Sequence, residues 1–437
     1  MKIYLGNYKL IIFIVFFSAI CRSLIFVETI YFTIVPIYVF IIINNRQYFF
    51  IKSNLQLFLF FIICFTIWSS ITALWSPYPL VSMSRSTWFL FIALGSTLLG
   101  FLTTNNVKEV IKSLCYLNII IVTITIFSLT TGIPNDSWTG GNQLGFKGFF
   151  YHQNSLGACI AFTLPFCIFY ISKRYTEKKL SNSVINTLNL KMISRWIPFI
   201  ILALIVFVNC ILIILSRSRG SLITLLIFLL IFTILIFRFR NFVFFTLIIV
   251  SIFVILFAFD DNFKSFSKEI IYKGGNSFGD SRYELISRSL IAAKSGSVFG
   301  LGYGISERGN SILLNWKEEN NQIRFVREKM VSILALIEEV GIIGLLLFIF
   351  PISYCLFFIG KYILTKNIWL RRFHKNNTTN FIILTDENYL IRSFILSYLI
   401  AISFHAQIES WWTGVSSTQL PFFYFMIGFS ANQFTRE

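Results

Sequence analysis

The sequence predicts an all-α polytopic membrane protein of about 12 transmembrane helices. Of its 437 residues, 56% are hydrophobic and only 13% are charged, whereas soluble domains carry roughly 25% charged residues. Apolar runs near 20 residues in length recur along the chain, and each can cross a hydrocarbon core of about 30 Å. A soluble globular protein is therefore excluded.

Twelve apolar runs account for the predicted spans and divide the chain into three parts. Residues 1–259 hold nine spans, residues 260–330 form a long hydrophilic loop, and residues 331–437 hold three spans. No small-residue cleavage site follows the first run, so we expect no cleavable signal peptide. The spans lie near residues 8–22, 24–43, 55–74, 86–102, 110–130, 153–172, 196–215, 220–237, 241–259, 331–359, 391–408 and 416–433.

The distribution of basic residues predicts the orientation. Cytoplasmic loops of membrane proteins carry an excess of lysine and arginine. With both termini in the cytoplasm, most of the 37 lysines and arginines fall on the inner side. Long segments cross regardless of charge, so residues 260–330 are placed outside. This bias also explains the net charge of +18, and no nucleic-acid partner is expected. The short outer loops hold only Arg22, Arg85, Lys147, Arg217 and Arg219.

Metal and cofactor motifs are missing from the sequence. The seven cysteines show no metal-ligand spacing, and His152, His374 and His405 are too few and too dispersed for a histidine-rich site. There is no GxxxxGK[ST] or HExxH pattern. We therefore expect no cofactor and no metal.

The hydrophilic loop is expected to carry short helices. Ser281 and Glu284 form a capping box, and Tyr283, Ile286 and Leu290 follow at helical spacing. This pattern predicts an amphipathic helix over about 281–295, on the membrane or on the helix bundle, with Gly296 as a left-handed cap. Residues 320–329 are expected to form a second helical turn.

Arg282 in the first turn of that helix is a candidate site residue. A cation there opposes the positive end of the helix dipole, and bound phosphate would remove this cost. The alternative is an arginine that reaches solvent or pairs with Glu284. Arg288 lies one to two turns further along the same helix.

Arg217 and Arg219 lie in a five-residue outer turn, residues 216–220, between two apolar runs. Guanidinium groups at membrane depth cost several kcal/mol unless they are paired. Either they bind an anion, or they extend to the lipid headgroups.

His152 lies in the segment 151–157 at the start of the sixth span. It is either an interfacial residue whose polar groups have hydrogen-bond partners or a catalytic residue. Glu338 and Glu339 lie inside the tenth span, where an ionisable group indicates function. Neighbouring residues project about 100° apart on a helix, so we expect at most one carboxylate to face the bundle squarely. Glu409, beside two tryptophans at the outer interface, is a weaker candidate.

Taken in series, these motifs resemble the O-antigen ligase and polymerase superfamily of bacterial surface-polysaccharide assembly, the Wzy-C family. The resemblance covers nearly the whole chain. It rests on residues 73–77 (ALWSP), 150–157 (FYHQNSLG), 216–220 (SRSRG), Ser281-Arg282 with 300–304 (GLGYG), and 339–344 (EVGIIG).

The resemblance implies a metal-independent glycosyltransferase of the bacterial inner membrane. Its donor would be a glycan on undecaprenyl diphosphate, and a sugar hydroxyl would attack the anomeric carbon. Family arginines thought to bind the diphosphate correspond to Arg282, Arg217 and Arg219, and Arg288 is added as a neighbour. A flippase and a chain-length regulator would be partners.

One departure from the family favours a polymerase of repeat units. Ligases of the family carry a His-Asn pair before the E-x-G-x-x-G helix, where this chain has Met330 and Val331. The general base is then open, with Glu339, Glu338 and His152 as candidates in that order. A ligase acting on lipid A-core or another acceptor is the alternative. A flippase is a further one, although no internal repeat is present.

Overall fold

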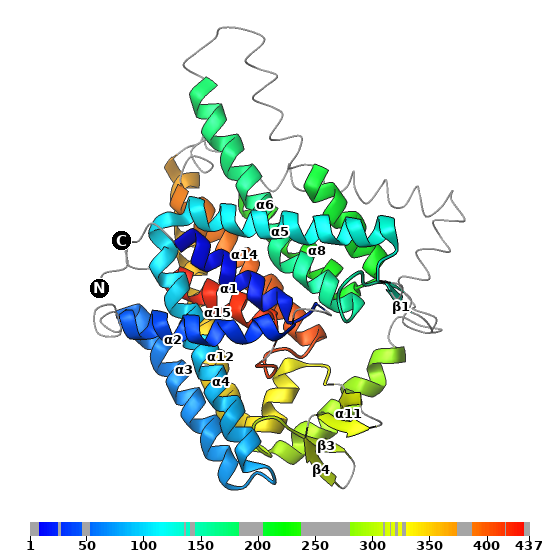
Figure 1. Cartoon of the computed structure of the whole chain (residues 1–437). Coiled ribbons are helices and arrows are strands. Elements are labelled where there is room, and N and C mark those ends of the chain that lie inside the picture. The colour runs from blue at the N-terminus through cyan, green and yellow to red at the C-terminus, as the bar shows by residue number, and fades with distance from the viewer. Residues whose placement is uncertain are drawn as a thin grey trace.

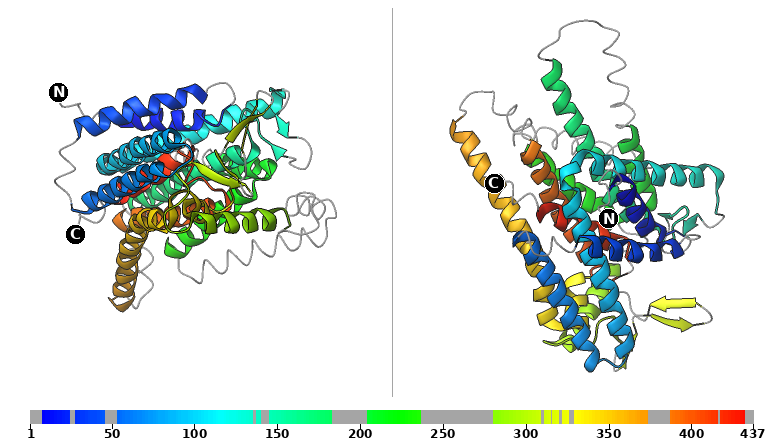
Figure 2. Two further views of the ribbon diagram at one scale, coloured as in Figure 1. Left: turned by 90° about the horizontal axis from the view of Figure 1, so that it is seen from below. Right: turned by 60° about the vertical axis from the view of Figure 1, so that its left-hand side comes forward.

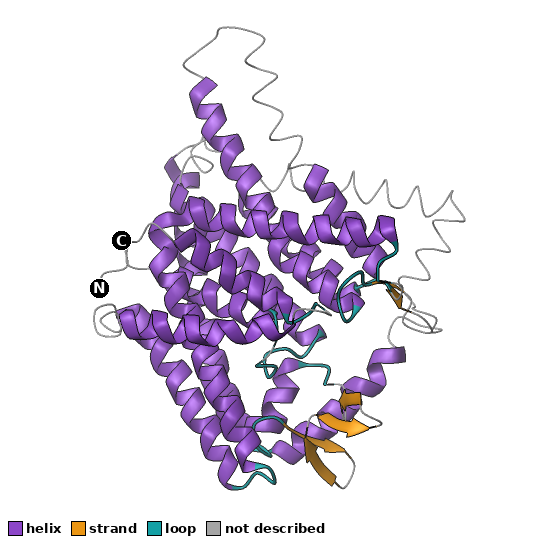
Figure 3. Ribbon diagram, viewed as in Figure 1, coloured by secondary structure: helices purple, strands orange, loops and turns teal. Residues whose placement is uncertain are grey.

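The computed structural model describes residues 8–24, 28–45, 53–134, 137–139, 145–182, 204–236, 280–308, 311–314, 316–319, 322–325, 329–373, 387–415 and 417–431. Within these ranges the molecule is a bundle of helices, and the strands lie at one side of it (Figure 1, Figure 3). The α-helices are α1 (Tyr8–Cys21), α2 (Ile34–Asn44), α3 (Ser53–Ile71), α4 (Pro79–Thr103), α5 (Val107–Thr131), α6 (Gln153–Asn182), an apolar helix Leu204–Ser216, α8 (Arg219–Ile236), α11 (Asp280–Gly296), α12 (Ser332–Phe373), α14 (Glu387–Ile408) and α15 (Gln419–Ala431).

Seven helices in the described ranges are long and apolar enough to span a membrane, and four shorter apolar helices accompany them. The fold class of an all-α polytopic membrane protein is thus confirmed. Every predicted span coincides with one of these eleven helices, except 241–259, which lies outside the described residues. The total of twelve spans stays a prediction.

Helix α15 lies inside the bundle, since every residue from Leu420 to Ala431 is buried. Two glycines allow it to pack tightly on α4. A Cβ on Gly428 would lie 1.9 Å from the Thr97 carbonyl oxygen, and one on Gly100 would lie 2.0 Å from that of Phe425. Small residues let membrane helices approach this closely because their attraction comes from van der Waals packing.

The alternating helix directions bring the predicted outer ends together. Trp75 after α3 donates to the Gly300 carbonyl (2.9 Å), and Ser332 at the start of α12 accepts from the Trp412 N–H (3.3 Å). At the opposite end, Lys9 pairs with Glu109 at 2.5 Å, and Lys173 pairs with Glu387. Two β-hairpins lie at one end of the molecule: β3 (Ile305–Arg308) with β4 (Ser311–Leu314), and β5 (Trp316–Glu319) with β6 (Gln322–Phe325). The C-terminal parts of α6 and α12 extend from the bundle at the opposite end (Figure 2).

Helix α12 is interrupted at Gly341, whose φ of 74° and ψ of −177° are not helical. The break leaves carbonyl groups without partners inside the helix, and other segments supply donors. The carbonyls of Glu338 and Glu339 accept from the N–H groups of Leu301 and Gly302 (2.9 and 3.0 Å), and the Val340 carbonyl accepts from the Trp68 indole (2.7 Å). The E-x-G-x-x-G pattern therefore encodes a helix break on which the segment after α11 docks.

Helix α11 extends one residue beyond the predicted range at each end, and its C-terminal cap differs from the prediction. The left-handed residue is Ser297 (φ 49°), not Gly296. Gly296 is small because α11 crosses α12 there, and a Cβ would lie 2.2 Å from the Ile337 carbonyl oxygen. Ala292, Ala293 and Gly296 of α11 are buried, so the helix lies on the bundle. The side chains of the expected capping box lie outside the described ones.

The second helical turn expected at 320–329 is wrong. The segment after α11 instead forms two antiparallel hairpins, in which the strands satisfy each other's backbone groups. A shorter pair, β1 and β2, joins α5 to α6. The strands are β1 (Trp138–Thr139), β2 (Gly145–Phe146), β3 (Ile305–Arg308), β4 (Ser311–Leu314), β5 (Trp316–Glu319) and β6 (Gln322–Phe325).

Candidate functional site

The arginine turn, residues 216–220, lies between the helix Leu204–Ser216 and α8. Arg217 has a φ of 51°, which is uncommon for a residue with a side chain, and its N–H donates to the Ile214 carbonyl at 3.0 Å. Arg219 is the first residue of α8. Both side chains are half-buried. Arg219 thus leaves the chain at the positive end of the α8 dipole, where a bound anion is favoured, and Arg217 directly follows the last residue of the preceding helix.

The start of α6 packs against this turn. A Cβ on Gly157 would lie 2.5 Å from that of Ser218, so only glycine allows the approach. The structure therefore joins the 151–157 and 216–220 motifs, which are some 60 residues apart in the sequence, into one unit.

His152 caps the start of α6. Its Nδ1 accepts the backbone N–H of Asn154 at 3.1 Å, the contact that N-cap side chains make. In a neutral ring the proton is then on Nε2. The lone pair that a general base needs is already engaged, which makes His152 a capping residue in this structure.

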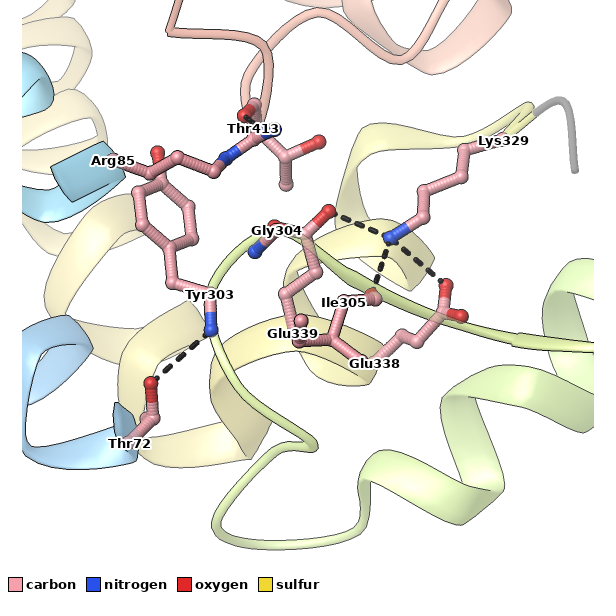
Figure 4. Close-up of polar contacts among 9 residues, drawn as sticks. All are labelled: Thr72, Arg85, Tyr303, Gly304, Ile305, Lys329, Glu338, Glu339 and Thr413. Carbon is pink, nitrogen blue, oxygen red and sulfur yellow. Dashed lines mark hydrogen bonds and ion pairs between the residues drawn. The ribbon is translucent and has the colours of Figure 1, made fainter. Parts of the chain in front are cut away.

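Glu338 and Glu339 surround the Lys329 ammonium group (Figure 4). The Lys329 Nζ lies 3.3 Å from Glu338 Oε2 and 2.6 Å from Glu339 Oε1, and it donates to the Ile305 carbonyl at 3.0 Å. The other oxygen of Glu339 accepts the Gly304 N–H at 2.7 Å. Three acceptors match the three donors of an ammonium group.

Both carboxylates are buried, with exposures of 1% and 0%, because Lys329 and the Gly304–Ile305 segment cover this side of α12. Burial by this segment does not test the expectation that at most one carboxylate faces the bundle squarely, which stays a prediction. A buried charge is tolerated when it is paired and hydrogen-bonded. These contacts assign Glu339 a role in holding the segment after α11 against α12.

Arg85 of α4 belongs to the same region, although the sequence pattern did not single it out. Its Nη2 donates to the Thr413 carbonyl at 2.5 Å, and its Cζ lies 5.4 Å from the centre of the Tyr303 ring. Tyr303 is fully buried, and its N–H donates to Thr72 Oγ1 at 3.2 Å (Figure 4). Burial raises the pKa of the Tyr303 phenol above its usual range, with Arg85 opposing and Glu339 adding to the shift.

Two signals could have revealed the missed cations. Pro79 favours a helix start at its own position, which would have placed Arg85 inside the fourth helix instead of in the preceding loop. Two adjacent acids in an apolar helix require a nearby cation, and Lys329 lies ten residues before Glu339.

The end of α14 and the loop 409–415 connect the arginine turn with the residues around Arg85 and Lys329. A Cβ on Gly220 of the arginine turn would lie 3.1 Å from Ile408 Cγ2. Further along, Thr413 contacts Arg85, and Tyr31 donates to the Val415 carbonyl at 2.8 Å. The arginine turn therefore lies on one side of the segment 408–415. The residues around Arg85 and Lys329 lie on its other side.

Of the two candidate arginines in α11, the structure describes both backbones but the side chain of only one. The backbone of Arg282 lies in the first turn of α11, as expected, but its side chain lies outside the described ones. Arg288 is exposed on α11, one residue before the buried Ser289.

Residues 202–349 match a family model described as Wzy_C, O-antigen ligase. The matched segment contains the arginine turn, α11 and the Glu338–Glu339 pair. No curated protein sequence matches the chain. A central third of the chain is thus similar to O-antigen ligases, and this supports its place in the O-antigen ligase and polymerase superfamily.

Proposed function

We propose that the chain is a glycosyltransferase that polymerises the repeat units of a bacterial surface polysaccharide at the outer face of the inner membrane. The observation that carries this proposal is the gathering of the family motifs at one end of the bundle. The arginine turn, the start of α6 and the broken helix α12 all lie beside the loop 409–415. The charge bias assigns this end to the outside.

The reaction joins two lipid-linked glycans. A hydroxyl of one glycan attacks the anomeric carbon of the other, and the bond from that carbon to the undecaprenyl diphosphate breaks. The diphosphate leaves with the electron pair and gains negative charge. Fixed guanidinium groups in a poorly hydrated site stabilise that charge, which is the largest contribution that many enzymes make. Arg217, Arg219 and Arg282 are proposed for this role, with Arg288 as a neighbour.

The segment before α12 favours a polymerase. The place where a ligase would carry histidine holds Met330, whose side chain is 4% exposed. Its neighbour Lys329 is bound by both glutamates. At the described residues 329–331, this segment therefore carries no histidine that could serve a foreign acceptor as the base of a ligase would.

Purified protein incubated with a single lipid-diphosphate oligosaccharide tests the proposal. A ladder of products on a gel is expected, because each unit supplies both donor and acceptor. A ligase is the second candidate, since the matched family model is described as an O-antigen ligase. Product that forms only after lipid A-core is added would reject the polymerase in favour of that ligase.

Alanine variants of the proposed diphosphate arginines test the site. Arg217→Ala, Arg219→Ala and Arg282→Ala are each expected to lower product formation on the order of 100-fold, the usual cost of losing one group that stabilises developing charge. Lys294→Ala is the matched control, because Lys294 is an exposed cation in the last turn of α11. Near wild-type product from an arginine variant would remove that residue from the site.

A further inference from the structure

At the outer end of α14, His405 lies in the last turn of the helix, and Glu409 is the first residue after it. His405 is fully buried, whereas the side chain of Glu409 is 22% exposed, and His405 Nε2 lies 3.9 Å from Glu409 Oε2. The ring of Phe162 packs edge-on against the imidazole at 5.4 Å. The pair therefore has a fixed inner member and an outer member that solvent reaches.

Trp411 sets the protonation pattern of the imidazole. Its indole N–H donates to His405 Nδ1 at 3.1 Å, and an indole nitrogen can only donate. Nδ1 must therefore accept, so the ring proton of neutral His405 is on Nε2. This N–H is on the side of the ring that faces the Glu409 carboxylate.

Glu409 also adjoins the arginine turn. A Cβ on Gly220 would lie 3.7 Å from Glu409 Oε1, and Gly220 directly follows Arg219. The carboxylate thus lies just after α14, beside the turn in which Arg219 begins α8.

The other described carboxylates do not combine these properties. Glu338 and Glu339 are buried beneath Lys329, while Glu109 and Glu387 lie at the opposite end of the bundle. A general base must come within hydrogen-bond reach of the proton that it removes. Among the acidic side chains that the structure describes, Glu409 is the one that is partly exposed beside the arginine turn.

We propose that Glu409 is the general base of the transfer and that His405 is its positioning residue. The assignment rests on the proposed function. As the acceptor oxygen bonds to the anomeric carbon, its proton moves to the Glu409 carboxylate. The electron pair of the breaking carbon–oxygen bond leaves with the diphosphate. The Nε2 atom of His405 lies 3.9 Å from the carboxylate, which is longer than a hydrogen bond, and its N–H orients the carboxylate by electrostatic attraction.

The test separates turnover from donor binding in purified protein. Glu409→Gln keeps the size of the side chain but removes the base, so turnover should fall on the order of 100-fold. Binding of undecaprenyl diphosphate, followed by tryptophan fluorescence, should remain at the wild-type affinity. Glu409→Asp should retain part of the turnover. Glu387→Gln, the same change at the opposite end, is the control.

The positioning role has its own readout. His405→Gln keeps an N–H that can reach the carboxylate and should retain more turnover than His405→Leu, at equal undecaprenyl diphosphate affinity. Wild-type turnover in Glu409→Gln would overturn the assignment. A parallel loss of undecaprenyl diphosphate binding would also overturn it, because Glu409 would then serve only to place the arginines. Both results differ from an inactive wild-type protein, which would count against the polymerase itself.

Discussion

Lys329 balances a buried group of charges that joins the segment after α11 to α12. Replacing it with alanine would leave Glu338 and Glu339 buried without their cation. Breaking a buried ion pair in this way costs about 3–5 kcal/mol. We expect Lys329→Ala to lower Tm in detergent clearly.

Two comparisons make this prediction specific. Lys294→Ala removes an exposed lysine from the same loop and should leave Tm unchanged. Adding Glu338→Gln and Glu339→Gln to Lys329→Ala should restore part of the stability, because no unpaired charge would remain buried. A Tm for Lys329→Ala equal to that of wild type would contradict the ionic role.

Among the elements, the break in α12 decides where the segment after α11 docks. Gly341→Ala places a Cβ at a φ of 74° and 2.1 Å from the Val298 carbonyl oxygen. Left-handed backbone costs about 1 kcal/mol or more in a residue with a side chain, and the clash adds to this. We expect faster proteolysis around α11 and a lower Tm.

Gly360→Ala is the control within the same helix. A Cβ at Gly360 meets nothing within 4 Å, and alanine is a better helix former by about 1 kcal/mol. This variant should be as stable as wild type or more so. If the two variants gave the same proteolysis pattern, the break would not be what holds the loop.

For the whole molecule, the prediction concerns orientation. Lys294 and Lys361 are both exposed, near opposite ends of the bundle, and the charge bias assigns them to opposite sides of the membrane. In spheroplasts, Lys294→Cys should react with a membrane-impermeant maleimide, and Lys361→Cys should react only after lysis. The wild-type protein corrects for its own cysteines, five of which are buried. The reverse pattern would invert the topology and move the proposed site to the cytoplasm.

Local patterns of the sequence predicted much of the fold. The apolar runs identified the eleven helices of the described spans, and helical spacing placed α11 within one residue at each end. These features depend on neighbours within a few turns, so one segment contains the information. The hairpins β3–β4 and β5–β6 were missed because strand pairing depends on contacts between segments.

The candidate site was only partly predictable for the same reason. The sequence pointed to Arg217, Arg219, His152 and the two glutamates, and the structure places each of them at one end of the bundle. It did not show that His152 caps a helix or that Lys329 occupies both glutamates.

By itself, the sequence determined the membrane class, most helix positions and the resemblance to polysaccharide ligases and polymerases, because hydropathy and short motifs are local properties. Only the tertiary structure decided which charges meet. Arg85 with Tyr303, Lys329 with its two glutamates, and Glu409 with the arginine turn come from segments far apart in the chain. Burial and pairing of charges depend on how the helices pack, and no single segment of the sequence carries that information.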